Sequence, residues 1–381
     1  MKSYNPYRLC SLLGLLIMVV LTGCAKRDGV LKIGCAAPIT GDQAKIGLDL
    51  LNGVKLAVEE ANQKGEVIPG YKLSVYEQDD QHNPAQAVSV AKKFIADRDV
   101  VAVVGHLNSS CTKPASSVYY EARIVQLSPA STNPEISKQG FDTFFRTCTT
   151  DDVQGPAGAV FAVGKLGVQK VYVIDDRTTY GKGLADEFHK KAQELGVKIL
   201  GHEGITQGDK DFTPLLTKIK ALMPDLIFFG GIYPEGALLI KQARNLNMKC
   251  PFMGGDGMFD ATLIKLATPQ AAEGTYITFF GADMEQLPTA KEFVLAYKAK
   301  YGEIGPFSTY AYDAANIVIE AIKRAGKKDR AAVLAEVKKT KDFHGAIGVT
   351  NFDARGDTLN KMIGIFQASG DRFKYIGPAE P

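Results

Sequence analysis

Residues 100–132 constrain the fold more than any other part of this chain. The stretch begins with the apolar run Val-Val-Ala-Val-Val, residues 100–104, which Gly105 ends. Such a run is typical of a strand that is buried on both faces of a parallel sheet. A helix is expected from about Pro114, and a second apolar run, residues 124–127, follows it. Strand, helix and strand in this order predict two neighbouring parallel strands with helices packed on the sheet.

Hydroxyl-rich turns follow both of these strands. Residues 106–112 read His-Leu-Asn-Ser-Ser-Cys-Thr, and residues 128–132 read Ser-Pro-Ala-Ser-Thr. The first turn of a helix has N–H groups without partners and a partial positive charge, so Ser109, Ser110 and Thr112 would add donors for a carboxylate or another small anion. Parallel strands bring both turns to one edge of the sheet, where open α/β sheets bind ligands. The alternative is that these hydroxyls only cap helices.

The alternation of strands and helices extends over most of the chain and predicts an α/β protein with parallel sheets. The other expected strands are residues 30–36, 72–76, 170–174, 225–229, 251–253, 347–352 and 362–367. The other expected helices are residues 48–64, 84–96, 153–165, 180–195, 212–222, 235–246, 290–301, 310–325 and 330–338. A chain of 381 residues exceeds the usual size of one domain, so we expect two lobes.

The N-terminal residues are typical of an export signal. Lys2 and Arg8 precede the apolar run 12–21, which is too short to span a bilayer but fits a signal peptide. The run ends in Leu-Thr-Gly-Cys, residues 21–24, which resembles a bacterial lipobox. Residues 1–23 would then be removed, Cys24 would carry lipid, and residues 24–29 would form a spacer of an exported, membrane-anchored lipoprotein, periplasmic or at the cell surface. An ordinary secretory signal with an incidental cysteine is the alternative.

Composition and motifs argue against several functions. The formal charge of +3 becomes +1 without Lys2 and Arg8, because residues 1–23 contain no acid, so nucleic acid is not implied. The five histidines show no metal-ligand spacing and are expected at the surface or at caps. No G-x-S-x-G or P-loop occurs, and the pairs 79–80 and 175–176, both Asp-Asp, are expected to cap helices. We therefore expect no enzyme activity, no metal and no cofactor.

Four further cysteines are far apart in the sequence. Buried free thiols are the favoured interpretation, although export permits disulfides and no pairing can be assigned. These residues are Cys35, Cys111, Cys148 and Cys250.

Five segments, in this order, resemble the branched-chain amino acid binding proteins of bacterial ABC transporters, the Leu/Ile/Val-binding family. They are residues 105–112, 128–132, 180–183, 210–212 and 252–257. The similarity extends over nearly all of the chain after Cys24, and the set of segments is specific for the family but much less so for the ligand.

The resemblance implies the two-lobe, type I periplasmic binding protein fold, with three crossovers forming the hinge. One lobe would combine residues 27–150 with 280–355, and the other residues 151–279 with 356–381. It also implies an amino acid ligand in the cleft, with leucine, isoleucine or valine as the expected ligands. Further implied partners are ABC permease subunits with their ATPase, and the binding protein itself is expected to be a monomer.

The resemblance also assigns residues to the site. Ser109 matches the serine that holds the ligand carboxylate, and Tyr180 matches a tyrosine that covers the ligand on closure. Asp256 stands where the family usually has a glutamate for the ammonium group. Turn 128–132 would contribute the backbone of Ala130, its neighbour Ser131, and the hydroxyl and backbone of Thr132.

The expected side-chain pocket departs from the family pattern. Leu107 matches a pocket residue, but Ile46 stands where the family often has an aromatic residue. Ile232 stands where the family often has a tyrosine, although Tyr233 is the next residue. The pair His82 and Asn108 replaces two cysteines that some members join. Hydrogen-bonded recognition is sharper than apolar recognition, so we expect strict choice of an α-amino acid and loose choice of its side chain.

Three functions remain open on the sequence alone. A transport binding protein is the first. A sensor of the same fold for amides or other amino acids is the second, and a secreted hydrolase, for which no nucleophile with its base is visible, is the third.

Overall fold

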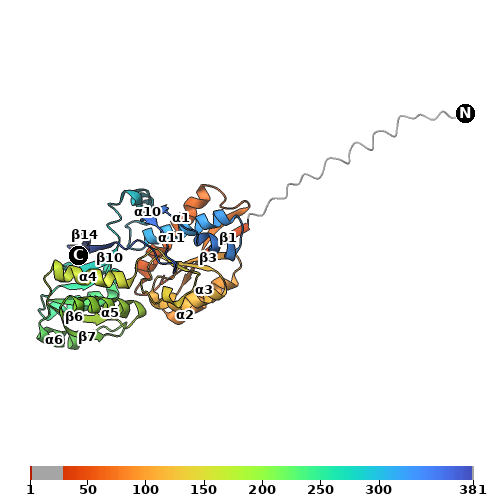
Figure 1. Cartoon of the computed structure of the whole chain (residues 1–381). Helices are drawn as coiled ribbons and strands as arrows, with labels where there is room; N and C mark the ends of the chain where they lie inside the picture. Colours follow the sequence, from red (N-terminus) through yellow and green to blue (C-terminus); the bar gives the residue numbers. More distant parts are fainter. Residues whose placement is uncertain (2–28, 380–381) are drawn as a thin grey trace.

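Two β-sheets organise the chain, and helices cover both (Figure 1). The computed structural model describes Met1 and residues 29–379. The predicted signal peptide, the lipobox with Cys24 and most of the spacer lie outside the described residues.

The first sheet has five parallel strands in the order β2-β1-β3-β4-β5. Its strands are β1 (Gly29–Ala37), β2 (Tyr71–Asp79), β3 (Val100–Gly105), β4 (Val125–Ser128) and β5 (Phe144–Arg146). Strand β3 is buried along its whole length, as a doubly covered strand requires. Helices α2 (Pro84–Ala96) and α3 (Ser109–Glu121) pack on each other, whereas α1 (Ala44–Gln63) packs on α11 (Ser308–Ala325).

The second sheet has seven strands in the order β14-β13-β10-β9-β8-β6-β7. Its parallel strands are β6 (Lys170–Asp175), β7 (Lys198–Gly204), β8 (Leu226–Gly230), β9 (Phe252–Gly254) and β10 (Tyr276–Phe280). Strands β13 (Ile363–Ser369) and β14 (Arg372–Pro378) add antiparallel pairs at one edge. Its helices are α4 (Asp151–Gly164), α5 (Thr179–Glu194), α6 (Thr213–Leu222), α7 (Tyr233–Asn245), α8 (Ala261–Ala267) and α9 (Pro269–Ala272).

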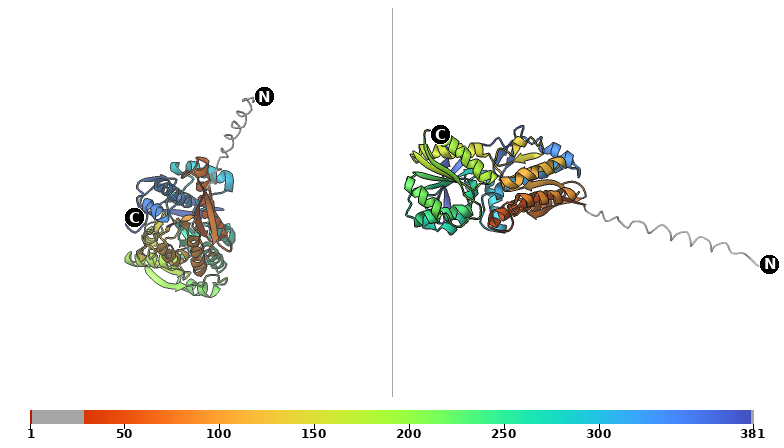
Figure 2. Two further views of the ribbon diagram at one scale, coloured as in Figure 1. Left: turned by 90° about the vertical axis from the view of Figure 1, so that its right-hand side faces the viewer. Right: turned by 90° about the horizontal axis from the view of Figure 1, so that it is seen from below.

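The chain passes three times between these two halves, which lie side by side (Figure 2). The crossovers lie between β5 and α4, between β10 and α10 (Lys291–Tyr301), and between the hairpin β11–β12 (Phe343–Gly345, Gly348–Thr350) and β13. We call the five-stranded sheet with α1–α3, α10, α11 and α12 (Arg330–Val337) the N-terminal lobe. The seven-stranded sheet with α4–α9 is the C-terminal lobe.

The structure confirms the α/β class and corrects several local predictions. Helix α3 begins at Ser109 and includes Pro114. The burial of Cys111, Ala115 and Tyr119 outweighs the low helix propensity of proline. Strands β5, β7, β10, β11 and β14 were not predicted; β14, for example, has one paired neighbour and only alternating partial burial.

The two Asp-Asp pairs do not cap the following helices. Asn83 caps α2 by accepting from two backbone N–H groups, and Thr178 caps α5. Asp80 is instead fully buried and accepts the hydrogen bond of His106 Nδ1 at 2.7 Å. The expectation that every histidine lies at the surface or at a cap is therefore wrong for His106, which is also fully buried.

Candidate ligand-binding site

The two hydroxyl-rich turns lie at the same edge of the N-terminal sheet, because β3 and β4 are paired in parallel register. Helix α3 begins there at Ser109, and the side chain of its N-cap residue, Asn108, does not cap it. The Ser109 hydroxyl accepts from the Asn133 backbone at 3.3 Å. Thr132 Oγ1 is buried and lies beside the Asp151 carboxyl. Open N–H groups and hydroxyls thus face one place, as an anion site requires.

Other hydroxyls of these turns hold the backbone in place. Ser131 Oγ donates to the Leu107 carbonyl at 2.9 Å and lies 2.6 Å from Thr112 Oγ1. Ser128 Oγ donates to the His106 carbonyl at 2.8 Å. The predicted role of Thr112 as an anion donor is therefore replaced by a structural one, and Ser131 makes the same kind of contact.

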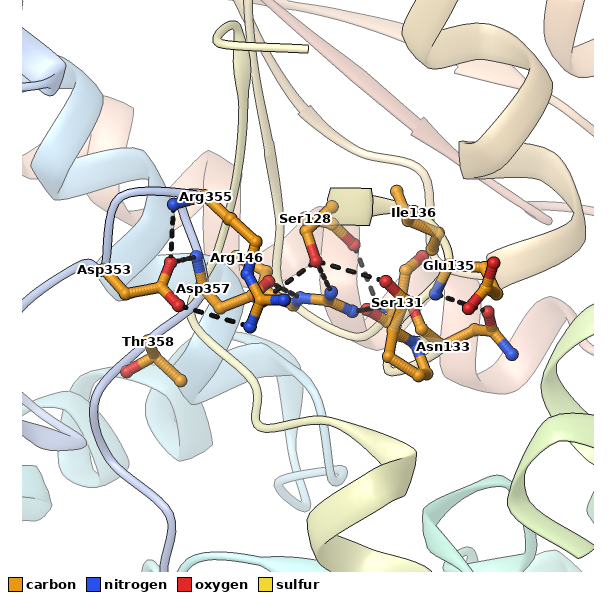
Figure 3. Close-up of polar contacts among 12 residues, drawn as sticks. Ser128, Ser131, Asn133, Glu135, Ile136, Arg146, Asp353, Arg355, Asp357 and Thr358 are labelled. Atoms are coloured by element: carbon orange, nitrogen blue, oxygen red, sulfur yellow. Dashed lines mark hydrogen bonds and ion pairs between the residues drawn. The ribbon is translucent and has the colours of Figure 1, made fainter. Parts of the chain in front are cut away.

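A buried arginine holds the second turn in place (Figure 3). Arg146 Nη1 donates to the carbonyls of Ser131 and Asn133 at 2.7 and 3.0 Å, and its Nε pairs with Asp357 at 2.6 Å. Both side chains of this ion pair are nearly inaccessible to solvent. Arg146 ends β5 at the first crossover and Asp357 lies in the third, so one ion pair joins two hinge segments to the turn that contains Ala130 and Thr132.

The C-terminal lobe contributes a carboxylate that a tyrosine orients. Tyr180 Oη donates to Asp256 Oδ1 at 2.9 Å and accepts from the Gly257 N–H at 2.8 Å. Burial raises the pKa of the Asp256 carboxyl to about 7. Asp256 does not cap α8, because Asp260 does so through Thr262 at 2.7 Å. The structure thus contradicts the capping alternative for Asp256 and shows Tyr180 contacting this acid.

A second buried acid, Asp151, was missed by the sequence interpretation. Its N–H donates to the Thr132 carbonyl at 3.0 Å, and its two carboxylate oxygens are buried beside the Thr132 hydroxyl. Burial raises its pKa well above the usual value, and the charge of Asp256 acts in the same direction. The Asp-Asp at 151–152 reads in sequence as the acidic first turn of a helix, which hides this role.

The predicted apolar lining is buried as well. Exposed fractions of 2–8 % are found for Ile46, Leu107, Ala130, Tyr180, Ile232 and Tyr233. Tyr233 also donates from its hydroxyl to the carbonyl of Asp42 in the opposite lobe.

The lobes are in contact across the cleft. Asn133 Nδ2 donates to the Thr179 carbonyl at 2.7 Å, and Gln207 Nε2 lies 2.9 Å from His82 Nδ1. The structure is therefore a closed one, with the hydroxyl turns of one lobe against the acids of the other. Such an arrangement offers donors to a carboxylate, acceptors to an ammonium group and apolar surface to a side chain.

Two classes of site find no support in the described residues. Over residues 29–379, no three His, Cys, Asp or Glu side chains come together as metal ligands would. The helices that the structure describes are all too short or too polar to cross a bilayer. The four described cysteines are free, and three of them are buried.

Comparison with known proteins identifies similar chains. A model of the periplasmic binding protein family matches residues 30–372. A Leu/Ile/Val-binding protein homolog 1 from Brucella suis biovar 1 (strain 1330) is 38% identical over 325 residues, which is 85% of this chain and 86% of that protein.

Solved structures are similar over almost the full length. A leucine binding protein LivK from Thermotoga maritima has a TM-score of 0.85 at 30% identity, covering 92% of this chain and 99% of that chain. The branched-chain amino acid transporter substrate binding protein LivJ from Streptococcus pneumoniae, in complex with isoleucine, has a TM-score of 0.84 at 31% identity, covering 92% and 100%.

Proposed function

The chain belongs to the periplasmic binding protein family, and from this premise we propose that it captures an α-amino acid between its lobes and delivers it to an ABC importer. Its fold is the type I periplasmic binding protein fold, as the sequence predicted. The relatives are named as binding proteins, which agrees with the prediction that the chain is not an enzyme. Their names support leucine, isoleucine or valine as the ligand class.

The observation that carries the proposal is that donors of one lobe face acids of the other across the closed cleft. The first turn of α3 offers donors, and the Thr132 hydroxyl lies beside the buried carboxyl of Asp151. A zwitterion supplies both complements, because its carboxylate accepts and its ammonium donates charge-assisted hydrogen bonds. We assign Ser109 and Thr132 to the carboxylate, and Asp256 and Asp151 to the ammonium.

A thermal-shift screen of the purified mature protein tests this proposal. A ligand that binds only the folded form raises the melting temperature. We expect leucine, isoleucine or valine to raise it, and the corresponding amines and carboxylic acids, which lack one of the two charges, to have no effect. A screen of all amino acids, amides and small aromatic acids without any hit would contradict amino acid capture.

Ser109→Ala is expected to weaken ligand binding by about 0.5–3 kcal/mol, because one donor is lost while backbone donors remain. Titration calorimetry with the best ligand of the screen measures this change. Ser117→Ala is a suitable control, since Ser117 lies on the same helix and its hydroxyl donates to the Pro114 carbonyl. An equal loss in both variants would assign the effect to α3 as a whole.

Closure should depend on the ligand. The two lobes are proposed to move about the three crossovers, as residues 27–150 with 280–355 and residues 151–279 with 356–381. Small-angle scattering with and without saturating ligand is expected to show a smaller radius of gyration in the bound state, because ligand contacts come from both lobes. An unchanged radius would count against a hinged clamp.

The proposed location is outside the cytoplasm, with a lipid anchor. If residues 21–24 form a lipobox, Cys24→Ser should abolish incorporation of a labelled fatty acid and leave the protein unprocessed or released. Metabolic labelling of the wild type and the variant measures this. Equal labelling of the two would contradict lipid attachment at Cys24.

A ligand sensor with the same fold is the alternative function. The cleft supports both functions equally, since capture and sensing need the same ligand contacts. Uptake of the labelled ligand by cells with and without the gene separates them, because only the transport function predicts reduced uptake.

A further inference from the structure

A cavity of about 460 Å³ lies between the lobes and borders the candidate site. Its walls are residues 38 and 40–43, 81–82, 207–208, 232 and 234–235. Ile232 belongs both to this cavity and to the predicted side-chain lining, so the cavity extends the site in the direction of the ligand side chain.

A hydrogen-bond chain along one wall has a defined direction. Burial lowers the pKa of His82 to about 4, so its ring is neutral at pH 7. His82 Nδ1 accepts a hydrogen bond from Gln207 Nε2 at 2.9 Å and also contacts Gln43 Nε2. Both neighbours are amide N–H₂ groups, so this ring nitrogen is the acceptor. Gln43 Oε1 then accepts from Asn108 Nδ2 at 2.9 Å. This series of hydrogen bonds therefore uses the N–H₂ group of Asn108 and leaves its Oδ1 without a donor.

Two buried oxygens at or next to the cavity wall are without donors: Glu235 lines the cavity, and Asn108 is bonded to Gln43, which lines it. Asn108 Oδ1 and Glu235 Oε2 have no hydrogen-bond partner in the described residues, and the two residues are 7 % and 3 % exposed. Glu235 Oε1 is occupied by the Gly208 N–H at 2.9 Å. Lysine and arginine are absent from the described wall of the cavity, although Lys210 lies 3.8 Å from Asp42 at its exposed rim. A ligand side chain that extends toward these oxygens with N–H donors would satisfy them, whereas a hydrocarbon side chain would leave them without partners.

We propose that the cleft also accepts α-amino acids whose side chains end in N–H donors, with Asn108 Oδ1 as the first acceptor and Glu235 as the second. The inference rests on the proposed capture of an α-amino acid and extends its ligand range beyond hydrocarbon side chains. Asparagine, glutamine and arginine share the required chemistry, and they differ in length and charge.

Calorimetry on the mature protein with pairs of similar shape tests the inference. The pairs are leucine with asparagine and methionine with glutamine, and arginine is the cationic probe. In the wild type, asparagine or glutamine is expected to bind within about tenfold of its apolar counterpart, since a hydrogen bond replaces the lost apolar contact. In Asn108→Leu, the ratio of the amide Kd to the hydrocarbon Kd is expected to rise about tenfold or more.

Further variants separate the two acceptors and guard against misfolding. Asn108→Asp keeps an acceptor at the site, so the amide-to-hydrocarbon ratio should stay near the wild-type value. Glu235→Gln removes the charge of the second acceptor and should raise the Kd of arginine more than that of glutamine, and an unchanged Kd for both ligands would remove Glu235 from the proposed site. Glu194→Gln removes one exposed charge from the same lobe at a distant ion pair with Lys191, and it should change neither ratio.

The outcomes distinguish this inference from the function on which it rests. Binding of leucine or methionine, with no binding of asparagine, glutamine or arginine, would overturn the inference and leave amino acid capture intact. An unchanged Kd ratio in Asn108→Leu would overturn it as well. Absence of binding by all five probes would contradict the extended range, and if the full amino acid screen is also empty, capture itself fails.

Discussion

Replacing Asp256 with asparagine is expected to weaken binding of an amino acid by about 2–5 kcal/mol, the usual effect of removing one partner of a buried charge pair. The substitution keeps the shape of the side chain and an acceptor for Tyr180, so the loss reports the charge. Charge-assisted hydrogen bonds are stronger than neutral ones, and the closed cleft limits competition from water. Titration calorimetry with the best ligand of the screen measures the change.

The same calorimetric measurement is repeated at several pH values. Burial raises the pKa of Asp256 to about 7, so the carboxyl is mostly protonated below pH 7. Pairing with an ammonium group needs the ionised form, so binding must release this proton at low pH. Wild-type affinity is therefore expected to fall as pH decreases below 7, by up to about tenfold per unit. Asp256→Asn should show a weaker dependence, with the remainder due to Asp151, whose pKa is also raised.

Asp260→Asn is the matched control for this prediction. Asp260 caps α8, and asparagine caps a helix as well as aspartate does, so affinity should stay within about twofold of the wild type. Near-wild-type affinity in Asp256→Asn would remove Asp256 from the site. That result would point to an uncharged or purely anionic ligand.

Replacing Asp357 with alanine is expected to lower the free energy of unfolding by about 3–5 kcal/mol, because the Arg146 guanidinium would remain buried without its counter-charge. Denaturant unfolding of the ligand-free protein measures this. The double variant Arg146→Met with Asp357→Leu should recover part of the loss, since apolar side chains can replace a buried ion pair, but the carbonyls of Ser131 and Asn133 would lose their donor.

Arg355 provides the control for the buried pair. Its guanidinium lies 3.8 Å from Asp357, but 55% of its side chain is exposed, so Arg355→Ala should change stability by less than about 1 kcal/mol. A decrease in the free energy of unfolding of less than about 1 kcal/mol in Asp357→Ala would contradict the view that this ion pair stabilises the hinge. The double variant also tests the site, because the carbonyls of Ser131 and Asn133 lose the guanidinium that holds them.

Part of the site could be predicted from the sequence because its parts are local. Apolar runs at residues 100–104 and 124–127 predicted β3 and β4, and their parallel pairing places turns 106–112 and 128–132 at one edge. A short carboxylate in a glycine-containing loop, Asp256, was selected by its resemblance to the family. Asp151 could not be selected in this way, because an acid in the first turn of a helix is ordinary in sequence.

The sequence by itself determined the alternation of strands and helices along most of the chain, the parallel class of the sheets and the family. These follow from periodicity, turn residues and motifs, which act over a few neighbouring residues. Only the tertiary structure decided which polar groups are paired. Arg146 and Asp357 meet across 211 residues, and Asp80 meets His106 in the interior, although local pattern placed Asp80 at a helix cap. The physical reason is that burial makes an unpaired charge unfavourable, and the partner that relieves it is chosen by packing in space rather than by distance along the chain.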